Sequence, residues 1–269
     1  MKKMILLTIC MLIPSTFIRA QVSIIAHRGA SYLAPENTIA SAKLAWKHGA
    51  DAVECDIWLS KDNKIIVSHD GNTKRTTGHD HKISETNSDV LRKLDAGSWK
   101  DPKYKGQKLP FLHELIKTVP AGKEIVIEIK CGPEVLPLLK ETIAGYAAKR
   151  KFTFICFDLP TITATREAFP QYPCYWLCDN PSLLEENFHK VKEAGLQGFS
   201  LNYRLITREI VDRASEMNLE VFAWTVNDRD EAHRLISLGV MGITTDRPQW
   251  LIEQLFARSP DSHSRPSGK

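Results

Sequence analysis

The segment DAVECDIWLSKDNKIIVSHD, residues 51–70, decides the fold. It holds two apolar runs of strand length, 51–58 and 64–68, and only a few polar residues, Ser60 to Asn63, lie between them. A parallel crossover needs a dozen residues or more, so the two runs cannot be parallel neighbours. We therefore expect an antiparallel hairpin in which Ile65 to His69 folds back over the end of the first strand.

Seven further apolar runs of strand length lie on either side of this segment, at 22–26, 124–129, 152–157, 173–177, 197–201, 219–226 and 240–245. Most of them are separated by helix-like segments, at 37–48, 133–149, 182–193, 207–217 and 228–238. Such alternation is typical of a parallel sheet with crossover helices. With the second arm of the hairpin set aside, eight parallel strands remain, which predicts an α/β fold, a TIM-like (β/α)8 barrel.

Residues 70–110 interrupt the alternation because they are polar and rich in turn-forming residues. A stretch of this length in a compact domain is more often functional than idle. We expect it to form a small inserted subdomain after the second-strand hairpin and to cap part of the barrel mouth. The barrel domain then covers 21–257, with the insertion at about 70–110.

The composition, 43% hydrophobic and 25% charged over 269 residues, is that of an ordinary globular domain. No internal apolar run is long enough to span a membrane. Five of the six cysteines lie after residue 20, without the spacing of a disulfide framework. We expect no disulfide to define this fold, and the sequence carries no signal for an oligomeric state.

The two ends of the chain differ from its body. Residues 1–20 have the pattern of a signal peptide, since Lys2 and Lys3 precede the apolar run 4–13 and a small residue, Ala20, ends the segment. We therefore expect export, to the periplasm or as a secreted protein, without a stable membrane anchor. Much of the formal net charge of +4 comes from this segment and from the tail 258–269, so nucleic acid is not an expected partner. The Ser, Pro and Gly content of the tail predicts disorder.

Polar residues gather where the predicted strands end, and a barrel of this type builds its active site at those carboxyl ends. Side chains two positions apart on a strand point to the same face. Glu54 and Asp56 therefore share a face, as do Glu128 and Lys130. The same end of the barrel receives the first strand and the returning arm of the hairpin, which supply His27, Arg28, His69 and Asp70.

Three carboxylates from neighbouring strands would repel one another in a partly dry barrel mouth unless a cation lay between them. An isolated Glu-x-Asp pair is most often a solvated face, but here apolar residues alternate with it on a buried strand. Ligation by oxygen alone suits a hard ion. Glu54, Asp56 and Glu128 are thus the predicted ligands of one divalent metal ion, calcium or magnesium.

His27 and His69 flank this predicted metal site and can exchange protons near neutral pH, one as base and one as acid. Arg28 and Lys130 supply the fixed positive charge that a phosphate group needs. Structural alternatives are a bridge to a carboxylate for Arg28 and a surface charge at a helix entry for Lys130. The other histidines lack charged partners at strand ends, so we interpret them as structural; they are His48, His79, His81, His113, His189 and His233.

With these segments in place, the chain resembles the glycerophosphodiester phosphodiesterase family. The matching segments follow the family's order across residues 24–250; they are AHRG at 26–29, APENT at 34–38, VECD at 53–56, VSHD at 67–70, IEIK at 127–130, AWTVN at 223–227 and TTDRP at 244–248. The resemblance implies metal-dependent hydrolysis of glycerophosphodiesters to glycerol 3-phosphate and an alcohol. It also implies a TIM-like barrel with an insertion after His69.

The resemblance assigns roles to particular residues. It implies catalysis by His27 and His69, metal ligation by the three carboxylates, phosphate contacts from Arg28 and Lys130, and a substrate contact from Trp224, for which a barrel-filling role is the alternative. We interpret 35–38 as structural, with Asn37 as a helix N-cap, and Asp246 as a turn or cap residue.

The chain departs from the family's pattern at the mouth. It has Cys156-Phe157-Asp158 where relatives often carry a Ser-Phe pair, and Ser200 to Asn202 end the seventh of the nine runs. These positions should shape the pocket for the leaving alcohol.

Two other functions compete with this prediction. A phosphodiesterase acting on lysophospholipid, sphingolipid or phosphoinositol headgroups would need an exposed apolar rim for docking to a bilayer. The insertion is mostly polar, which favours soluble substrates. A non-catalytic protein that binds phosphate headgroups should have lost a histidine or a metal carboxylate, and this chain retains all five.

Overall fold

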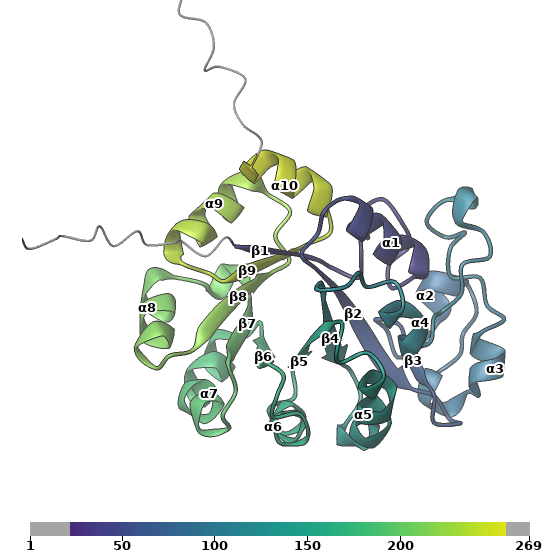
Figure 1. The fold of residues 1–269 in the computed structure, drawn as a ribbon, viewed down its shortest axis with the longest axis horizontal. Coiled ribbons are helices and arrows are strands. Elements are labelled where there is room, and N and C mark those ends of the chain that lie inside the picture. Colours follow the sequence, from purple (N-terminus) through teal and green to yellow (C-terminus); the bar gives the residue numbers. More distant parts are fainter. Residues whose placement is uncertain (1–21, 257–269) are drawn as a thin grey trace, which may run out of the picture.

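The structure is a computed structural model that describes residues 22–256. The predicted signal peptide, 1–20, and the predicted disordered tail, 258–269, lie outside the described residues. Figure 1 shows the described part as a ring of strands with helices outside it.

Nine strands form the sheet, and eight of them are parallel. The first strand, β1, pairs with both β2 and β9, so the eight parallel strands close into a barrel. The third strand, β3, runs antiparallel to β2 and pairs it at Ile57 to Leu59. The predicted hairpin and the predicted (β/α)8 barrel are therefore confirmed. The strands are β1 (Ser23–Ala26), β2 (Ala52–Leu59), β3 (Ile65–Val67), β4 (Glu124–Ile129), β5 (Lys151–Cys156), β6 (Cys174–Cys178), β7 (Gly198–Asn202), β8 (Glu220–Trp224) and β9 (Gly242–Thr245).

Helices connect the parallel strands on the outside of the barrel (Figure 1). Several begin at a side chain that accepts a hydrogen bond from the first helical turn, such as Asn180, Thr207 and Asp228. All five predicted helical segments contain a helix, and α4, α6 and α10 lie outside those segments. The helices are α1 (Ile39–Lys47), α4 (Leu112–Ile116), α5 (Leu136–Ala144), α6 (Leu159–Ala168), α7 (Pro181–Glu193), α8 (Arg208–Glu216), α9 (Arg229–Leu238) and α10 (Pro248–Phe256), with 3-10 turns η3 (Pro133–Val135) and η4 (Tyr203–Leu205).

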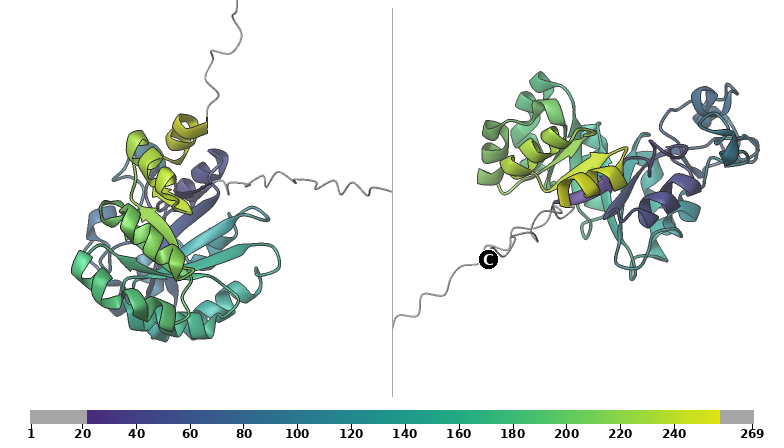
Figure 2. Two further views of the ribbon diagram at one scale, coloured as in Figure 1. Left: turned by 90° about the vertical axis from the view of Figure 1, so that its left-hand side faces the viewer. Right: turned by 90° about the horizontal axis from the view of Figure 1, so that it is seen from above.

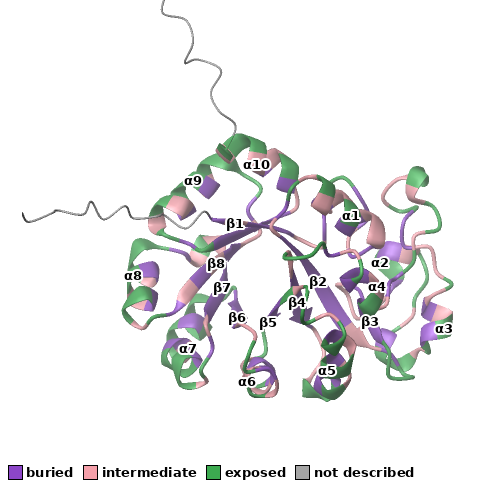
Figure 3. Cartoon of the chain, viewed as in Figure 1, coloured by how far each residue is buried: buried purple, intermediate pink, exposed green. Residues whose placement is uncertain are grey.

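The core has two parts because side chains alternate between the faces of each strand. On the outer face, residues such as Val53, Cys55 and Ile57 pack against the helices in one large apolar cluster. A smaller apolar cluster includes Ile25, Ala52, Val126, Ile155, Tyr175 and Leu177, which lie on the inner face. Figure 3 shows that the strands are largely buried while the helices expose their outer sides. The inner apolar layer leaves the positions above it, nearer the carboxyl ends of the strands, for the polar residues.

The apolar side chains of the insertion pack on the hairpin. It contains the short helices α2 (Lys74–Thr77) and α3 (Ser88–Leu91) and the 3-10 turns η1 (Ile83–Glu85) and η2 (Pro102–Tyr104). Its apolar side chains form a small cluster with Ile66 of β3 and with Trp58 of β2; the insertion contributes Ile83, Leu91, Ala96 and Leu109. Figure 2 shows the insertion projecting from one side of the barrel. No helix in residues 22–256 is long and apolar enough to cross a membrane.

Candidate active site

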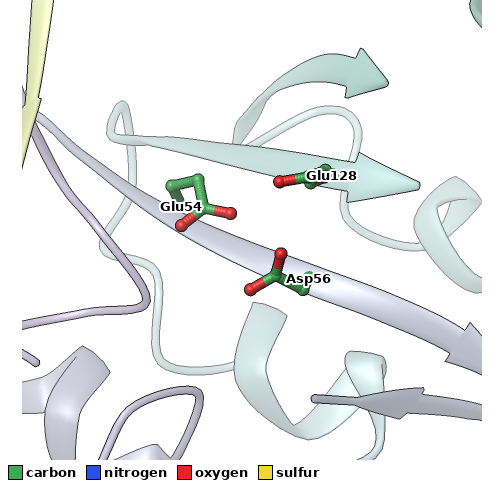
Figure 4. Close-up of side chains that lie close together, drawn as sticks. All are labelled: Glu54, Asp56 and Glu128. Atoms are coloured by element: carbon green, nitrogen blue, oxygen red, sulfur yellow. The ribbon is translucent and has the colours of Figure 1, made fainter. Parts of the chain in front are cut away.

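Three carboxylates meet at the carboxyl ends of β2 and β4. Glu54 and Asp56 leave the same face of β2, and Asp56 lies beside Glu128 in the parallel register of the two strands. One oxygen from each of the three lies within 4.8 Å of the other two. Figure 4 shows the three side chains converging. The structure therefore brings together the three residues that the sequence predicts as metal ligands.

The electrostatics of this cluster are unfavourable without a cation. All three side chains are buried, and Glu54 Oε1 and Asp56 Oδ1 have no hydrogen-bond partner. Burial and the neighbouring charges of Asp56 and Glu128 raise the pKa of Glu54 well above its usual value. Burial and the charge of Asp56 raise the pKa of Glu128 to about 7. Unpaired carboxylate oxygens that converge on one point are compatible with a divalent metal ion.

The loop after β1 holds the outer oxygens of two of these carboxylates. The backbone N–H of Arg28 donates to Glu54 Oε2 at 2.8 Å, and the side-chain amide of Asn37 donates to Asp56 Oδ2 at 2.8 Å. Asn37 has a left-handed backbone (φ 56°), and the N-cap of α1 is Thr38. The prediction that Asn37 caps the helix was therefore wrong, because its side chain turns toward β2 to orient a carboxylate.

The same loop needs Gly29. Its φ is +81°, and a Cβ atom there would lie 2.5 Å from Ser41 Oγ and 2.6 Å from the Ser41 carbonyl carbon. Arg28 also has a positive φ, 53°, which is uncommon for a residue with a side chain. This tight turn aims the Arg28 N–H at Glu54 while α1 packs closely beneath it.

Each of the two predicted catalytic histidines pairs with a carboxylate. His27 Nδ1 lies 2.7 Å from Asp246 Oδ1, and His69 Nδ1 lies 2.6 Å from Asp70 Oδ1. Both rings line one cavity at the barrel mouth, and pairing at Nδ1 leaves Nε2 free for a substrate. Burial lowers the pKa of His69, and the nearby charge of Asp56 opposes that effect.

Asp246 is a functional candidate that sequence reasoning missed. Besides His27, it accepts hydrogen bonds from Ser31 Oγ at 2.9 Å and Asn227 Nδ2 at 2.6 Å. Burial opposes its ionised form, but the hydrogen bond and charge of His27 outweigh burial and lower its pKa. The interpretation as a turn or cap residue overlooked this contact. Its position directly after β9, at the end of the barrel that holds the site, was the available signal.

The two predicted phosphate-binding cations lie beside the carboxylates. Lys130 Nζ donates to Glu128 Oε1 at 2.7 Å and lies 3.5 Å from Asp56 Oδ1. Arg28 Nη1 donates to Glu36 Oε1 at 2.9 Å, while its Nε lies 3.6 Å from Asp56 Oδ2. Both side chains also line the cavity, so each is within reach of an anionic group bound there.

A cavity of about 210 Å³ connects these groups to the far side of the barrel mouth. The far wall is formed by Ile155, Phe157, Leu177, Asp179, Ser200, Trp224, Thr225 and Thr244. Trp224 meets Phe157 edge to face, with ring centroids 5.5 Å apart, and donates from Nε1 to the carbonyl of Ser200. Residues 70–110 contribute nothing to the lining, so the expectation that the insertion caps part of the mouth is not met at this cavity.

Five described cysteines, Cys55, Cys131, Cys156, Cys174 and Cys178, are free thiols. Burial raises the pKa of Cys156 to about 12 and that of Cys174 to about 12, so neither is a reactive thiolate. The polar groups at the barrel mouth instead combine fixed cations, paired histidines and a carboxylate cluster. This combination defines a class of protein, a TIM-barrel enzyme suited to acid–base chemistry on a phosphate ester.

The comparisons with known proteins identify the family within that class. Residues 27–250 match the glycerophosphoryl diester phosphodiesterase family, and the chain belongs to it. This confirms the resemblance and the enzyme class that it implied.

Relatives and solved structures cover nearly the whole domain. YhdW of Bacillus subtilis is 33% identical over 234 residues, covering 86% of this chain and 96% of YhdW. A glycerophosphodiester phosphodiesterase of Caldanaerobacter subterraneus subsp. tengcongensis is 32% identical over 236 residues, covering 85% of this chain and 96% of its own. A phosphodiesterase of Oleispira antarctica, solved with its product sn-glycerol 3-phosphate, superposes with a TM-score of 0.80 at 28% identity. The match covers 86% of this chain and 96% of the Oleispira chain.

Proposed function

We propose that this member of the family hydrolyses glycerophosphodiesters to glycerol 3-phosphate and an alcohol, with one bound divalent metal ion. The observation that carries the proposal is the convergence of Glu54, Asp56 and Glu128 beside two histidines in one cavity. The family and the product complex of the Oleispira antarctica relative support the substrate class.

The metal would be held by Glu54, Asp56 and Glu128, with calcium or magnesium fitting their all-oxygen donor set. Once bound, such an ion neutralises charge on the phosphodiester oxygens. Arg28 and Lys130 bind the same phosphate from the sides, and their fixed charges favour the extra negative charge of the transition state. Glu36 and Glu128 hold the two cations in place through the hydrogen bonds already described.

The histidines move the protons. One takes a proton from the nucleophile through Nε2 while the other donates a proton to the leaving alkoxide, and Asp246 and Asp70 keep both rings oriented. Two nucleophiles fit this scheme, a water molecule and the neighbouring hydroxyl of the glycerol moiety. The second would release a cyclic phosphate first, so product analysis at short reaction times distinguishes them.

Trp224 and Phe157 are proposed to contact the organic part of the substrate. Among the exposed large hydrophobic side chains of residues 22–256, Phe157 alone also lines the cavity. No other exposed large apolar side chain of the described residues joins Phe157 in the cavity lining, and this supports soluble diesters over membrane lipids. Export to the periplasm or outside the cell remains part of the proposal, based on residues 1–20.

The experiment is a rate measurement with purified protein on a panel of glycerophosphodiesters and lysophospholipids, with and without chelator. His27→Ala and His69→Ala should each lower kcat by at least about a hundredfold, the lower range for loss of a general acid or base. His189→Ala, an exposed residue of α7, serves as control and should be unaffected. Near-normal activity of either site variant, or wild-type inactivity on every diester, would refute the proposal.

A further inference from the structure

Arg75, in α2 of the insertion, bonds to two carboxylates that serve different parts of the site. Its Nε donates to Asp70 Oδ2 at 2.6 Å. Its Nη1 and Nη2 donate to Glu36 Oε2 and Oε1, both at 2.8 Å. One guanidinium group thus joins the residue after His69 to the loop that follows β1.

Each of these carboxylates also binds a group that lines the cavity. Asp70 uses its other oxygen to hold His69 Nδ1 at 2.6 Å. Glu36 uses Oε1 to hold Arg28 Nη1 at 2.9 Å. Arg75 itself does not line the cavity. Its hydrogen bonds reach the cavity through Asp70 to His69 and through Glu36 to Arg28.

The charges show why both carboxylates need this cation. Glu36 is mostly buried, and burial opposes its ionised form, but the hydrogen bond from Arg75 and the charge of Arg28 outweigh burial and lower its pKa. The hydrogen bond from Arg75 is the largest cause that lowers the pKa of Asp70, to about 2. Without Arg75, Glu36 would keep Arg28 as its one charged partner, and Asp70 would lose its fixed orientation.

We propose that Arg75 is a positioning residue, a single guanidinium from the insertion that fixes His69 through Asp70 and Arg28 through Glu36. This inference rests on the proposed function. The insertion does not line the cavity, and this inference gives it a role at the active site. A lysine cannot replace Arg75, because one ammonium group does not offer the planar set of donors that reaches both carboxylates.

The test compares the kinetics of Arg75→Ala, Arg75→Lys, Glu36→Gln and Asp70→Asn in the full-length chain with its metal supplied. Arg75→Ala should lower kcat/KM about tenfold to a hundredfold, by analogy with the loss of groups that orient metal-ligating side chains. Glu36→Gln should mainly raise KM through Arg28, Asp70→Asn should mainly lower kcat through His69, and Arg75→Ala should do both. Arg75→Lys should not restore the rate.

Chemical rescue provides a second readout that a purely structural role would not move. The Arg75 side chain is 43% exposed, so a small cation can enter the space left by Arg75→Ala. Guanidinium at low, non-denaturing concentration should recover part of kcat in that variant, and sodium at equal ionic strength should not.

The matched control is Arg92→Ala. Arg92 lies next to α3 in the same insertion and donates to the Leu109 carbonyl and to Glu114, away from the site. It should lower the melting temperature without changing kcat or KM well below that temperature. An equal kinetic loss in Arg92→Ala, or kinetics within twofold of wild type in Arg75→Ala, would overturn the inference. An inactive wild type would instead refute the proposed function, and the inference with it.

Discussion

Two groups of carboxylates lie within the same barrel mouth, and they are paired in opposite ways. Glu54 and Asp56 each leave a buried oxygen without a hydrogen-bond partner, and the pKa of Glu54 is raised. Asp70 and Asp246 are instead held by a histidine and further donors, and their pKa values are lowered. The protein itself completes the hydrogen bonding of the second group, whereas under the proposed function a bound divalent cation completes the first.

This difference separates two contributions to activity. Under the proposed function, the cluster on β2 and β4 is destabilising in the metal-free protein and is stabilised when an ion binds, a trade that functional sites commonly make. The histidine-carboxylate pairs do not destabilise the metal-free protein in this way, because each carboxylate has a partner. Substitutions in the cluster should therefore change activity, metal binding and metal-free stability, whereas substitutions in the histidine-paired group should change activity without changing metal binding.

The largest effect is expected for Glu54→Gln. Loss of the ion removes several kcal/mol of charge stabilisation, so activity should fall at least about a thousandfold. In chelated protein the same change should raise the melting temperature, because it removes a buried repulsive charge. Activity assays and thermal unfolding measure the two effects.

Glu124→Gln is the control for this variant, since Glu124 lies on β4 at the opposite end from Glu128. It should leave activity intact. A chelated Glu54→Gln protein that melts below chelated wild type would contradict the idea that repulsion dominates the cluster.

A smaller loss is expected for Asp246→Asn. The amide keeps the shape of the side chain but removes the charge that pairs with His27, so kcat should fall about tenfold to a hundredfold. Metal affinity should not change, which separates this group from the cluster. Asp230→Asn, an exposed residue of α9 paired with Arg229, removes the same charge without touching a histidine and should be neutral. Weaker metal binding in Asp246→Asn would break the proposed separation.

The smallest effect is a change of stability with pH. The folded-state pKa of Glu128, about 7, lies above its unfolded value of roughly 4.3. Its contribution to stability is therefore fully present below about pH 4 and is lost as pH rises through about 7. Chelated protein should lose roughly 3 to 4 kcal/mol across this window from this residue. Denaturant unfolding with and without saturating metal checks it.

For the histidine-paired carboxylates, stability changes with pH in the opposite direction and over a different pH range. The pKa of Asp70 is lowered to about 2, so its contribution is present above roughly pH 4 and is lost as pH falls toward 2. Added metal should not alter this loss of stability at low pH. A chelated protein with flat stability between pH 5 and 8 would contradict the account of the cluster.

The sequence was sufficient to predict the barrel and the cluster, because both follow from local rules. The short link at 60–63 required a hairpin, and the two-residue spacing of Glu54 and Asp56 required a shared face. The two-residue spacing also placed Lys130 on the face of Glu128, and the end of the first strand placed His27 at the mouth.

Partners that depend on loop conformation were not predictable in this way. Asn37 resembles an N-cap residue in sequence, and only its left-handed backbone turns it toward Asp56. Arg75 lies in an irregular segment without periodicity, so nothing local indicates that it reaches Glu36, 39 residues earlier in the chain. The contact between Asp246 and His27 spans 219 residues and exists because β9 pairs with β1.

The most direct test is calorimetric titration of chelator-treated protein with calcium and with magnesium. Wild type and Asp246→Asn should each bind one ion per chain, and Glu54→Gln and Glu128→Gln should bind none. Binding that is absent in wild type, or unchanged in the two glutamine variants, would contradict the claim that these carboxylates form a metal site.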